Sequence, residues 1–412
     1  MKQVFRAGYG EEAFASPVGV ELAGYGYFLG RVCTGIMDKL MVRAAALEWG
    51  DTREIILSAD LIGLDENLES RIRAGLESEF GYKQEEIMLV CIHTHTGPAT
   101  NDLVGCGKMD HEYVKTVPEK FLTAARRALK DLSEVTKCEE AAKPIEPVGY
   151  NRVRPDGPHD AVVRGVLLRR GDKAPLALVS YPCHPVTLGR RSKASADYPG
   201  MLCRMSNKQG YKTVFLNGCC GDIDPVSNHI KWGSGTRTTL RAYAERIWEG
   251  FLAGLKETKP HLASMRFDAS IPLRPMERSE LEKLAADAGQ PKVAEVWLRD
   301  MLARLGEPDE EHFPVSGVRI GNTSFFAVPY EGFTRIGDAA RETLPGKNLV
   351  VLGCADWTRT YLPDIAPGEE LTYAAYSAAV LYRHRIIAPG AAASLGIQIG
   401  SAARAFYPGK KK

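Results

Sequence analysis

Two histidines, His93 and His95, stand one residue apart at the end of an apolar run, and Gly97-Pro98 follows them. The apolar run, residues 87–92, predicts a buried β-strand that delivers the imidazoles to a cleft. Side chains two positions apart share one face of an extended chain, whereas on a helix they would be about 200° apart. That arrangement suits metal binding. A histidine at a strand end is also often a hydrogen-bonded core or rim residue, so further ligands must be found.

Several other reactive or metal-capable side chains also come directly after apolar runs. In open α/β sheets, ligands bind outside the carboxyl ends of the strands, so such side chains can share one cleft although they are distant in sequence. Besides His93, the residues in such positions are Asp60, His184, Asn217, Asp222 and Glu331.

Strand-like and helix-like runs alternate along the chain, which predicts an α/β fold. No linker rich in Pro, Gly or Ser divides the chain, so we expect one domain spanning residues 1–412. The expected helices cover residues 67–80 and 113–132, and the expected strands cover 54–59, 87–92, 162–169, 176–181, 213–216, 265–271, 315–320, 324–328 and 349–353.

Residues 276–306 differ from the rest in having apolar side chains at helical spacing among many charges. The pattern predicts a helical insertion, divided by Gly289-Gln290-Pro291. An amphipathic helix pair packed on the sheet is favoured over a separate binding module, because patterned helices usually bury one face.

Composition excludes several classes of protein. A formal net charge of +2 provides no field for nucleic acid or an anionic membrane, and the only basic run is the terminal Lys410-Lys411-Lys412, which we expect to be solvated. No stretch is long enough to span a membrane, and no secretory signal is evident, so a cytoplasmic protein is expected. Nine cysteines without repeated spacing argue against a disulfide framework. A homo-oligomer stays open.

Two imidazoles and a carboxylate, His93, His184 and Glu331, form a standard set of catalytic zinc ligands. Such sites leave a position for water, whose pKa falls to about 7. Structural zinc sites usually show short local spacings, which this chain lacks, so a metal here is expected to be catalytic.

The chain resembles the catalytic domain of the neutral ceramidase family. The motifs that carry the resemblance run in order through residues 1–400: HTHTGP (93–98), NRVRP (151–155), CHPVTLG (183–189), NGCCGDIDP (217–225), PYEGFTR (329–335) and the segment around Tyr361. The resemblance implies a mixed β-sheet core flanked by helices.

The resemblance also implies a zinc-dependent amide hydrolase with His93, His184, Glu331 and Tyr361 as metal ligands. His95 becomes a contact to the substrate or transition state, and Arg152 becomes the group that holds a developing oxyanion. Two further acids, Asp60 and Asp222, are expected either to orient the imidazoles or to cap a turn.

The chain departs from the ceramidases in ways that bear on the substrate. Asp224 stands where the family has a serine in GDVSPN, which excludes a serine nucleophile at this position. We also expect the β-sandwich that follows the ceramidase catalytic domain, and the secretion signal, to be missing. A membrane sphingolipid is therefore an awkward substrate.

We expect a zinc-bound hydroxide to attack a carbonyl, with Asp224 or His95 assisting proton transfer. Arg152 and the metal would stabilise the oxyanion. Asp224 could equally bind a polar substrate group or cap the Gly-Asp turn. A small anionic or sugar-like substrate would suit the polar, mainly basic loop residues, which are Asn101, Asp102, Arg152, Arg154, His159, Arg190, Arg191, Lys193, Asn228, His229, Lys231, Trp232 and Arg359.

Two other kinds of function remain open from the sequence. The first is an esterase, lactonase or glycoside hydrolase on the same scaffold, with paired carboxylates drawn from Asp222, Asp224 and Glu331. The second is a catalytically silent binding protein that keeps the pocket.

Overall fold

The computed structural model describes residues 3–154, 156–366 and 368–407. The last residue of the NRVRP motif, Pro155, and the basic run at residues 410–412 lie outside the described residues.

Within the described residues, nine strands form a large mixed sheet, with the order β11-β9-β8-β6-β1-β3-β4-β5 and with β13 paired to β6. The pairs β4–β5 and β9–β11 are parallel, and the other neighbours are antiparallel. The strands are β1 (Phe5–Ala13), β3 (Met41–Trp49), β4 (Thr52–Ala59), β5 (Ile87–Cys91), β6 (Ser133–Pro144), β8 (Val162–Arg170), β9 (Leu176–Tyr181), β11 (Lys212–Asn217) and β13 (Lys256–Thr258).

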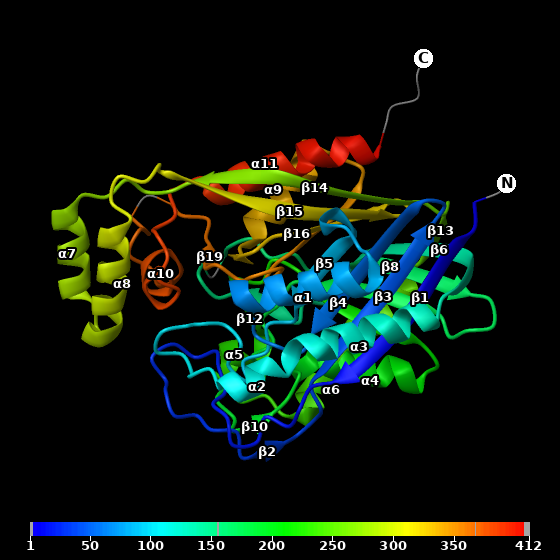
Figure 1. The fold of residues 1–412 in the computed structure, drawn as a ribbon, viewed down its shortest axis with the longest axis horizontal. Helices are drawn as coiled ribbons and strands as arrows, with labels where there is room; N and C mark the ends of the chain where they lie inside the picture. The colour runs from blue at the N-terminus through cyan, green and yellow to red at the C-terminus, as the bar shows by residue number, and fades with distance from the viewer. Residues whose placement is uncertain (1–2, 155, 367, 408–412) are drawn as a thin grey trace.

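A second sheet of four strands packs against the first, and helices cover the two outer faces (Figure 1). The second sheet has the order β14 (Leu262–Pro272), β15 (Glu310–Ile320), β16 (Thr323–Ala327) and β18 (Asn348–Leu352). The large sheet carries α1 (Glu66–Phe80), α3 (Val117–Lys130), α4 (Asp197–Lys208) and α6 (Arg237–Gly254), and the smaller sheet carries α9 (Thr334–Thr343) and α11 (Ala391–Ala403).

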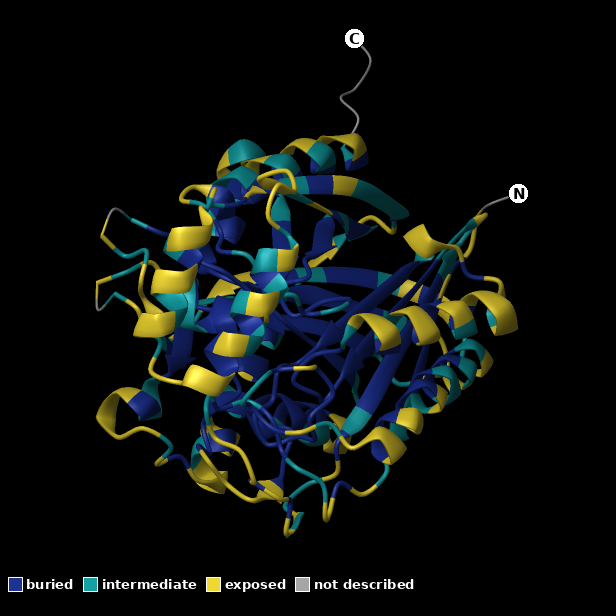
Figure 2. Ribbon diagram, turned by 60° about the vertical axis from the view of Figure 1, so that its left-hand side comes forward, coloured by how far each residue is buried: buried dark blue, intermediate teal, exposed yellow. Residues whose placement is uncertain are grey.

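This layering confirms the expected mixed β-sheet core flanked by helices, with the core divided between two sheets. Buried ribbon fills the interior while exposed residues lie on the outer helices and loops (Figure 2). Shorter elements lie around the layers: β2 (Gly35–Ile36), β7 (Gly149–Asn151), β10 (Lys193–Ala194), β12 (Ile223–Pro225), β17 (Glu331–Gly332), β19 (Tyr361–Leu362), α2 (His111–Lys115) and α5 (Val226–Ile230).

The central strands are apolar on both faces because both faces are covered. In β5, Leu89 and Cys91 point to the helical layer, whereas Met88 and Val90 point to the second sheet. A strand buried on both sides reads as a continuous apolar run, which is why this strand was evident from the sequence.

Helix α3 lies unusually close to β1, and two glycines permit it. A Cβ atom added at Gly8 or Gly10 would lie 2.0 Å from the carbonyl oxygen of Ala128 or Ala124, respectively. Any side chain at these positions would push the helix off the sheet.

The large sheet curves so that its two edge regions meet. Ser58 in β4 donates to the carbonyl oxygen of Phe215 in β11 at 2.5 Å, and Asn217 at the end of β11 donates to that of Ile92, beyond β5, at 2.9 Å. The segment after β18 joins the same place, since Cys91 N–H donates to Cys354 O at 3.0 Å. The carboxyl ends of β5, β11 and β18 therefore converge.

The expected strands and the expected helix at 67–80 are present, and the expected helix at 113–132 is divided into α2 and α3. The long elements that were not expected are β1, β3, β6, α4, α6, α9 and α11. None of the described helices combines the length and apolarity that crossing a membrane requires.

The helical insertion is present as α7 (Arg278–Asp287) and α8 (Pro291–Ala303), but it does not pack on the sheet as expected. It packs against α10 (Ala378–Leu381) and the chain after it, at one end of the molecule (Figure 1). Trp297 is fully buried in this contact, and its indole N–H donates to the carbonyl oxygen of His384 at 2.8 Å.

We predict that Trp297→Ala lowers the free energy of unfolding by about 3–5 kcal/mol, because it leaves a large cavity and an unpaired buried carbonyl. Urea unfolding should still show one transition if the insertion belongs to a single domain. Glu295→Ala, on the exposed side of α8, is the control and should change stability by less than about 0.5 kcal/mol. A separate early transition in the Trp297→Ala protein would contradict the single-domain prediction.

Candidate metal centre

The histidine pair lies in a turn and not on a strand. Strand β5 ends at Cys91, and His93 has a φ of 69°, in the left-handed region that non-glycine residues rarely occupy. The expectation that both histidines extend the strand is therefore wrong. The turn holds His93 through its N–H, which donates to Leu61 O at 2.9 Å. Backbone strain of this kind is found where surrounding structure fixes a functional residue.

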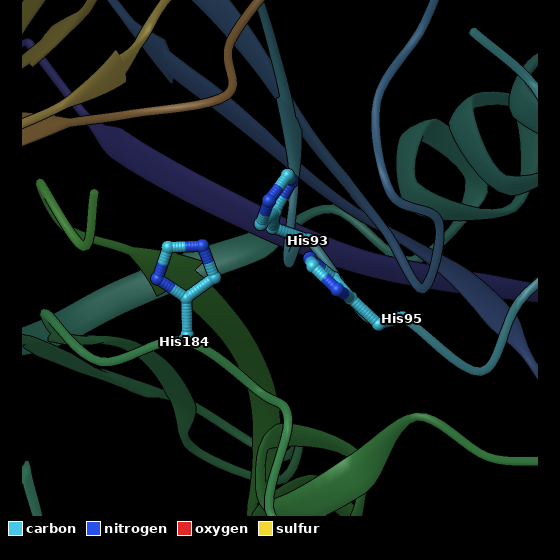
Figure 3. Close-up of side chains that lie close together, drawn as sticks. All are labelled: His93, His95 and His184. Carbon is cyan, nitrogen blue, oxygen red and sulfur yellow. The ribbon is translucent and has the colours of Figure 1, made fainter. Parts of the chain in front are cut away.

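Three buried histidines nevertheless converge here, two from this turn and His184 from the segment after β9. The rings of His93, His95 and His184 face a common space (Figure 3), and a ligand atom from each lies within 4.8 Å of the others. The ring centroids are 4.8 Å apart for His93 and His95, 5.0 Å for His93 and His184, and 5.6 Å for His95 and His184.

Backbone carbonyls orient two of the three rings. His93 Nδ1 lies 2.6 Å from the carbonyl oxygen of Ile62, and His184 Nδ1 lies 2.5 Å from that of Cys220. Each Nδ1 therefore carries the proton, and each Nε2 is left as a lone-pair donor aimed inward. This is the arrangement that metal-binding histidines normally show.

A buried carboxylate faces both Nε2 atoms. Glu331 Oε2 lies 3.2 Å from His184 Nε2 and 3.0 Å from His93 Nε2, the latter outside hydrogen-bond alignment. The second oxygen, Oε1, accepts a hydrogen bond from the hydroxyl of Tyr382. Burial alone would raise the pKa of Glu331, but His93 and His184 hold it well below its usual value.

Short strands set the position of Glu331. Strand β17 pairs in parallel with β19, which places Glu331 beside Tyr361. On the other side, a Cβ at Gly221 would lie 2.5 Å from the carbonyl oxygen of Glu331, so only glycine allows this approach. The NGCCGDIDP and PYEGFTR motifs therefore meet here.

His95 differs from the other two histidines. Among the described residues, neither of its ring nitrogens has a hydrogen-bond partner, although the ring is buried. Its backbone carbonyl accepts a hydrogen bond from Arg31 Nη2 at 2.6 Å, and the loop at Gly24 packs directly on its ring. Burial, followed by the neighbouring His93 and His184, keeps the pKa of His95 well below its usual value, so the imidazole is neutral.

These groups fit a divalent cation such as zinc. Imidazole nitrogens and a carboxylate are its ordinary ligands, and the buried Nε2 of His93 lacks an aligned partner within the described chain. Unpaired buried polar atoms are costly, and a cation between the rings and Glu331 would remove that cost.

Arg152 joins Asp224 to Tyr361 beside the histidines. Strand β7 pairs with β12, which contains Asp224, and Arg152 follows directly after β7 with its N–H donating to the carbonyl oxygen of Asp222 at 2.8 Å. The guanidinium donates to Asp224 Oδ1 at 3.1 Å, to the carbonyl oxygen of Gly221 at 2.8 Å and to the hydroxyl of Tyr361 at 2.8 Å. Burial raises the pKa of Tyr361 well above its usual value, against the opposing effect of Arg152.

The two remaining acids are fully engaged away from the rings. Asp222 Oδ1 accepts from the backbone N–H and the hydroxyl of Thr334, at 2.9 and 3.0 Å, which caps the start of α9. Asp60 pairs with Arg43 at 2.8 Å and accepts from Met41 N–H at 2.9 Å. Neither touches an imidazole, so the suggested orienting role is not theirs; the carbonyls of Ile62 and Cys220 perform it.

Sequence reasoning missed Tyr382, Tyr25 and Arg31. Tyr25 packs edge-on against His95, with ring centroids 5.0 Å apart, and Arg31 binds the His95 carbonyl. No spacing or motif marks these residues, because they reach the centre from segments with no apolar strand before them.

Some expected rim residues are already engaged elsewhere. Arg154 pairs with Asp364 and Glu369, and Arg359 pairs with Glu311. The buried side chain of Asn101 donates to the carbonyl oxygen of Thr358 at 3.0 Å. These residues support the loops around the centre and have little capacity left for a substrate.

No protein-family model matches the sequence, and no curated protein is similar to it. Solved ceramidase structures share its fold, including the following two. The neutral ceramidase from Pseudomonas aeruginosa aligns over 100% of this chain and 76% of its own, with a TM-score of 0.75 and 17% identity. A ceramidase complexed with C2 aligns over 99% of this chain and 76% of its own, with a TM-score of 0.74 and 15% identity. The fold of this chain is therefore that of a neutral-ceramidase-like catalytic domain, as the motifs indicated.

Proposed function

We propose that the protein is a zinc-dependent hydrolase that cleaves an amide or a related carbonyl bond of a small polar substrate. The observation that carries this proposal is the buried meeting of His93, His184 and Glu331, with both ring Nε2 atoms within 3.2 Å of one carboxylate oxygen. Two imidazoles and a carboxylate from distant segments have no structural need to meet, and they match a catalytic zinc site. Tyr361 is the fourth proposed ligand.

Zinc bound here would lower the pKa of a water molecule and polarise the substrate carbonyl. The chain's own groups would do the rest. The Tyr382 hydroxyl donates to Oε1 of Glu331, which leaves Oε2, the oxygen that faces the histidines, to bind the metal.

His95 is proposed to move a proton and not to bind the metal. Metal-binding histidines nearly always donate their second ring nitrogen to a fixed partner, as His93 and His184 do, whereas His95 has none among the described residues. A neutral imidazole with both nitrogens free can accept a proton at one and donate at the other.

Arg152 is proposed to stabilise the negative charge that develops on the carbonyl oxygen. Its guanidinium is fixed by three acceptors, so it needs no reorganisation during the reaction. Asp224 is proposed to assist proton transfer. Its hydrogen bond with Arg152 holds the carboxylate beside the group proposed to stabilise the oxyanion.

The bond type is proposed from the fold that this chain shares with the two ceramidase structures. An esterase or lactonase would use the same groups. A glycoside hydrolase is less favoured, because Asp222 is occupied in capping α9 and Asp224 is paired with Arg152. A silent binding protein would have no use for a buried set of unpaired metal ligands.

We predict that His93→Ala and His184→Ala proteins retain less than about a tenth of the zinc of the wild type and lose hydrolytic activity. His95→Ala should keep its zinc while kcat falls by about 10²–10⁴-fold, the usual contribution of a general acid or base. Elemental analysis and a hydrolysis screen of amides, esters, lactones and glycosides measure both effects. Chelation should abolish activity, and added zinc should restore it.

The same measurements can contradict the proposal. A wild-type protein that contains no stoichiometric metal after growth with zinc would remove its basis. Loss of zinc in His95→Ala, with retention in His93→Ala, would exchange the roles of the two residues.

For Tyr361→Phe we predict a smaller effect on the metal, with affinity about 10-fold weaker, because a phenol is an auxiliary ligand beside two imidazoles and a carboxylate. Zinc competition with a fluorescent chelator measures the change. An unchanged zinc affinity would leave Tyr361 as a partner of Arg152 alone.

Replacement of Asp224 by Asn keeps an oxygen that can accept from Arg152 but removes the carboxylate. We predict that zinc content and Tm stay unchanged while kcat falls by about 10²-fold with little change in KM. If Asp224 instead binds a polar group of the substrate, KM would rise while kcat stays the same. Steady-state kinetics on the best substrate of the screen separate the two roles.

A further inference from the structure

One arginine beside the proposed centre is held between aromatic rings. The guanidinium carbon of Arg190 lies 4.8 Å from the ring centroid of Phe28, 5.3 Å from that of Trp232 and 5.9 Å from that of Tyr25. Phe28 and Trp232 are 42% and 45% exposed, which is unusual for side chains of their size. A guanidinium on aromatic faces keeps its N–H groups directed outward along its edge.

The charge of Arg190 is not neutralised. Over the described part of the chain, no carboxylate forms an ion pair with Arg190 or with its neighbours Arg191, Lys193 and Lys231. Arg152, Arg154 and Arg359, also around the centre, each have a carboxylate partner. The loops on the side of Arg190 therefore hold unpaired positive charge.

The position of Arg190 relative to the centre is fixed by buried contacts. Tyr25 bridges the two places, with its ring 5.0 Å from that of His95 and 5.2 Å from that of Trp232. Arg31 donates to the carbonyl oxygen of Arg191 at 2.8 Å and to that of His95 at 2.6 Å. The buried guanidinium of Arg31 thus connects the loop that carries Arg190 directly to the turn that carries His95.

The hydroxyl of Tyr25 is a second sign that this region is built to receive a ligand. It is buried, and within the described residues it has no hydrogen-bond partner. A buried hydroxyl without a partner is costly in a folded protein, and a polar group of a bound molecule would satisfy it.

We propose that Arg190 determines substrate specificity by binding an anionic group, such as a carboxylate, on one side of the scissile amide. Arg190 would donate two hydrogen bonds to the anion, Tyr25 would donate a third, and Phe28 and Trp232 would pack on the carbon atoms beside it. The proposal rests on the proposed hydrolase function and adds the class of substrate, which is an N-acyl amino acid or a similar acidic amide.

The first test measures binding without catalysis. Trp232 stacks on Arg190, so its fluorescence reports on the site, and a Trp232→Phe protein identifies its share of the signal. N-hexanoylglycine and N-hexanoylethanolamine differ only in a carboxylate against a hydroxymethyl group. We expect the carboxylate to bind about 10-fold more tightly to His95→Ala protein, and this preference to vanish when Arg190→Gln is added.

The second test compares turnover of the same two compounds. The ratio of their kcat/KM values should fall by about 10-fold in Arg190→Gln, while the value for the neutral compound changes less than about 2-fold. Arg71→Gln, an exposed arginine in α1, removes the same charge far from the site and should leave the ratio unchanged. Arg190→Lys should recover only part of the preference, because a lysine lacks the planar stack.

Three results would overturn the assignment. The first is equal binding of the two compounds to the His95→Ala protein with Arg190 intact in the fluorescence titration. The second is an equal loss of the preference for the carboxylate compound in Arg191→Gln. That result would indicate that a diffuse positive field, and not a specific site, attracts the anion. The third is weaker binding in Trp232→Ala with unchanged binding in Arg190→Gln. That result would indicate that the aromatic rings stack on a neutral group such as a sugar. If neither an amide nor an ester or lactone is hydrolysed, the proposed function fails, but the titration still decides the role of Arg190.

Discussion

The carboxylate of Glu331, buried between His93 and His184, is the constraint on which the site depends. A buried negative charge is strongly unfavourable unless a cation or several donors compensate it. Here one oxygen has the Tyr382 hydroxyl and the other faces two Nε2 atoms whose rings already donate through Nδ1. The two Nε2 atoms lie 3.0 and 3.2 Å from that oxygen, and a divalent cation bound between the rings and the carboxylate would compensate the buried negative charge.

The layered fold brings His93, His184 and Glu331 together from the ends of three different strands. The two edge regions of the large sheet meet, and the second sheet closes over the seam, so the turns after β5, β9 and β16 face each other. Close backbone approach makes this possible, because Gly221 lies against Glu331 with no room for a side chain. The helical insertion contacts the chain on either side of Tyr382. It packs on the segment that carries Tyr382, and Trp297 is bonded to His384 two residues beyond that tyrosine.

The sequence predicted the meeting of His93, His184 and Glu331 because each follows a strand of buried apolar residues. This pattern can be recognised in one sequence without related sequences. Sequence-based prediction failed at residues whose local pattern does not match their role in the folded protein. Strand β3 contains three consecutive alanines and β6 is rich in charge, so neither resembles a strand. Asp60 follows a strand as the ligands do, but Arg43 from the neighbouring strand binds it. Tyr382 enters from an irregular segment, and only packing reveals it.

The charges of the centre favour one class of substrate over another. Asp224 and Arg152 neutralise each other, and a divalent cation would exceed the single charge of Glu331, so the proposed loaded site is positive. The loops with Arg190 add further positive charge that no acid among the described residues neutralises. Asp224, which stands where the resemblance to ceramidases implies a serine, has its carboxylate against Arg152, and in the proposed reaction it would lower the positive charge that an oxyanion meets. An acidic amide would offset that loss, because the proposed site binds its anion at Arg190 and its reacting carbonyl beside His95. A long neutral lipid would gain nothing from the charge of Arg190, so the proposed charges favour an acidic amide over it.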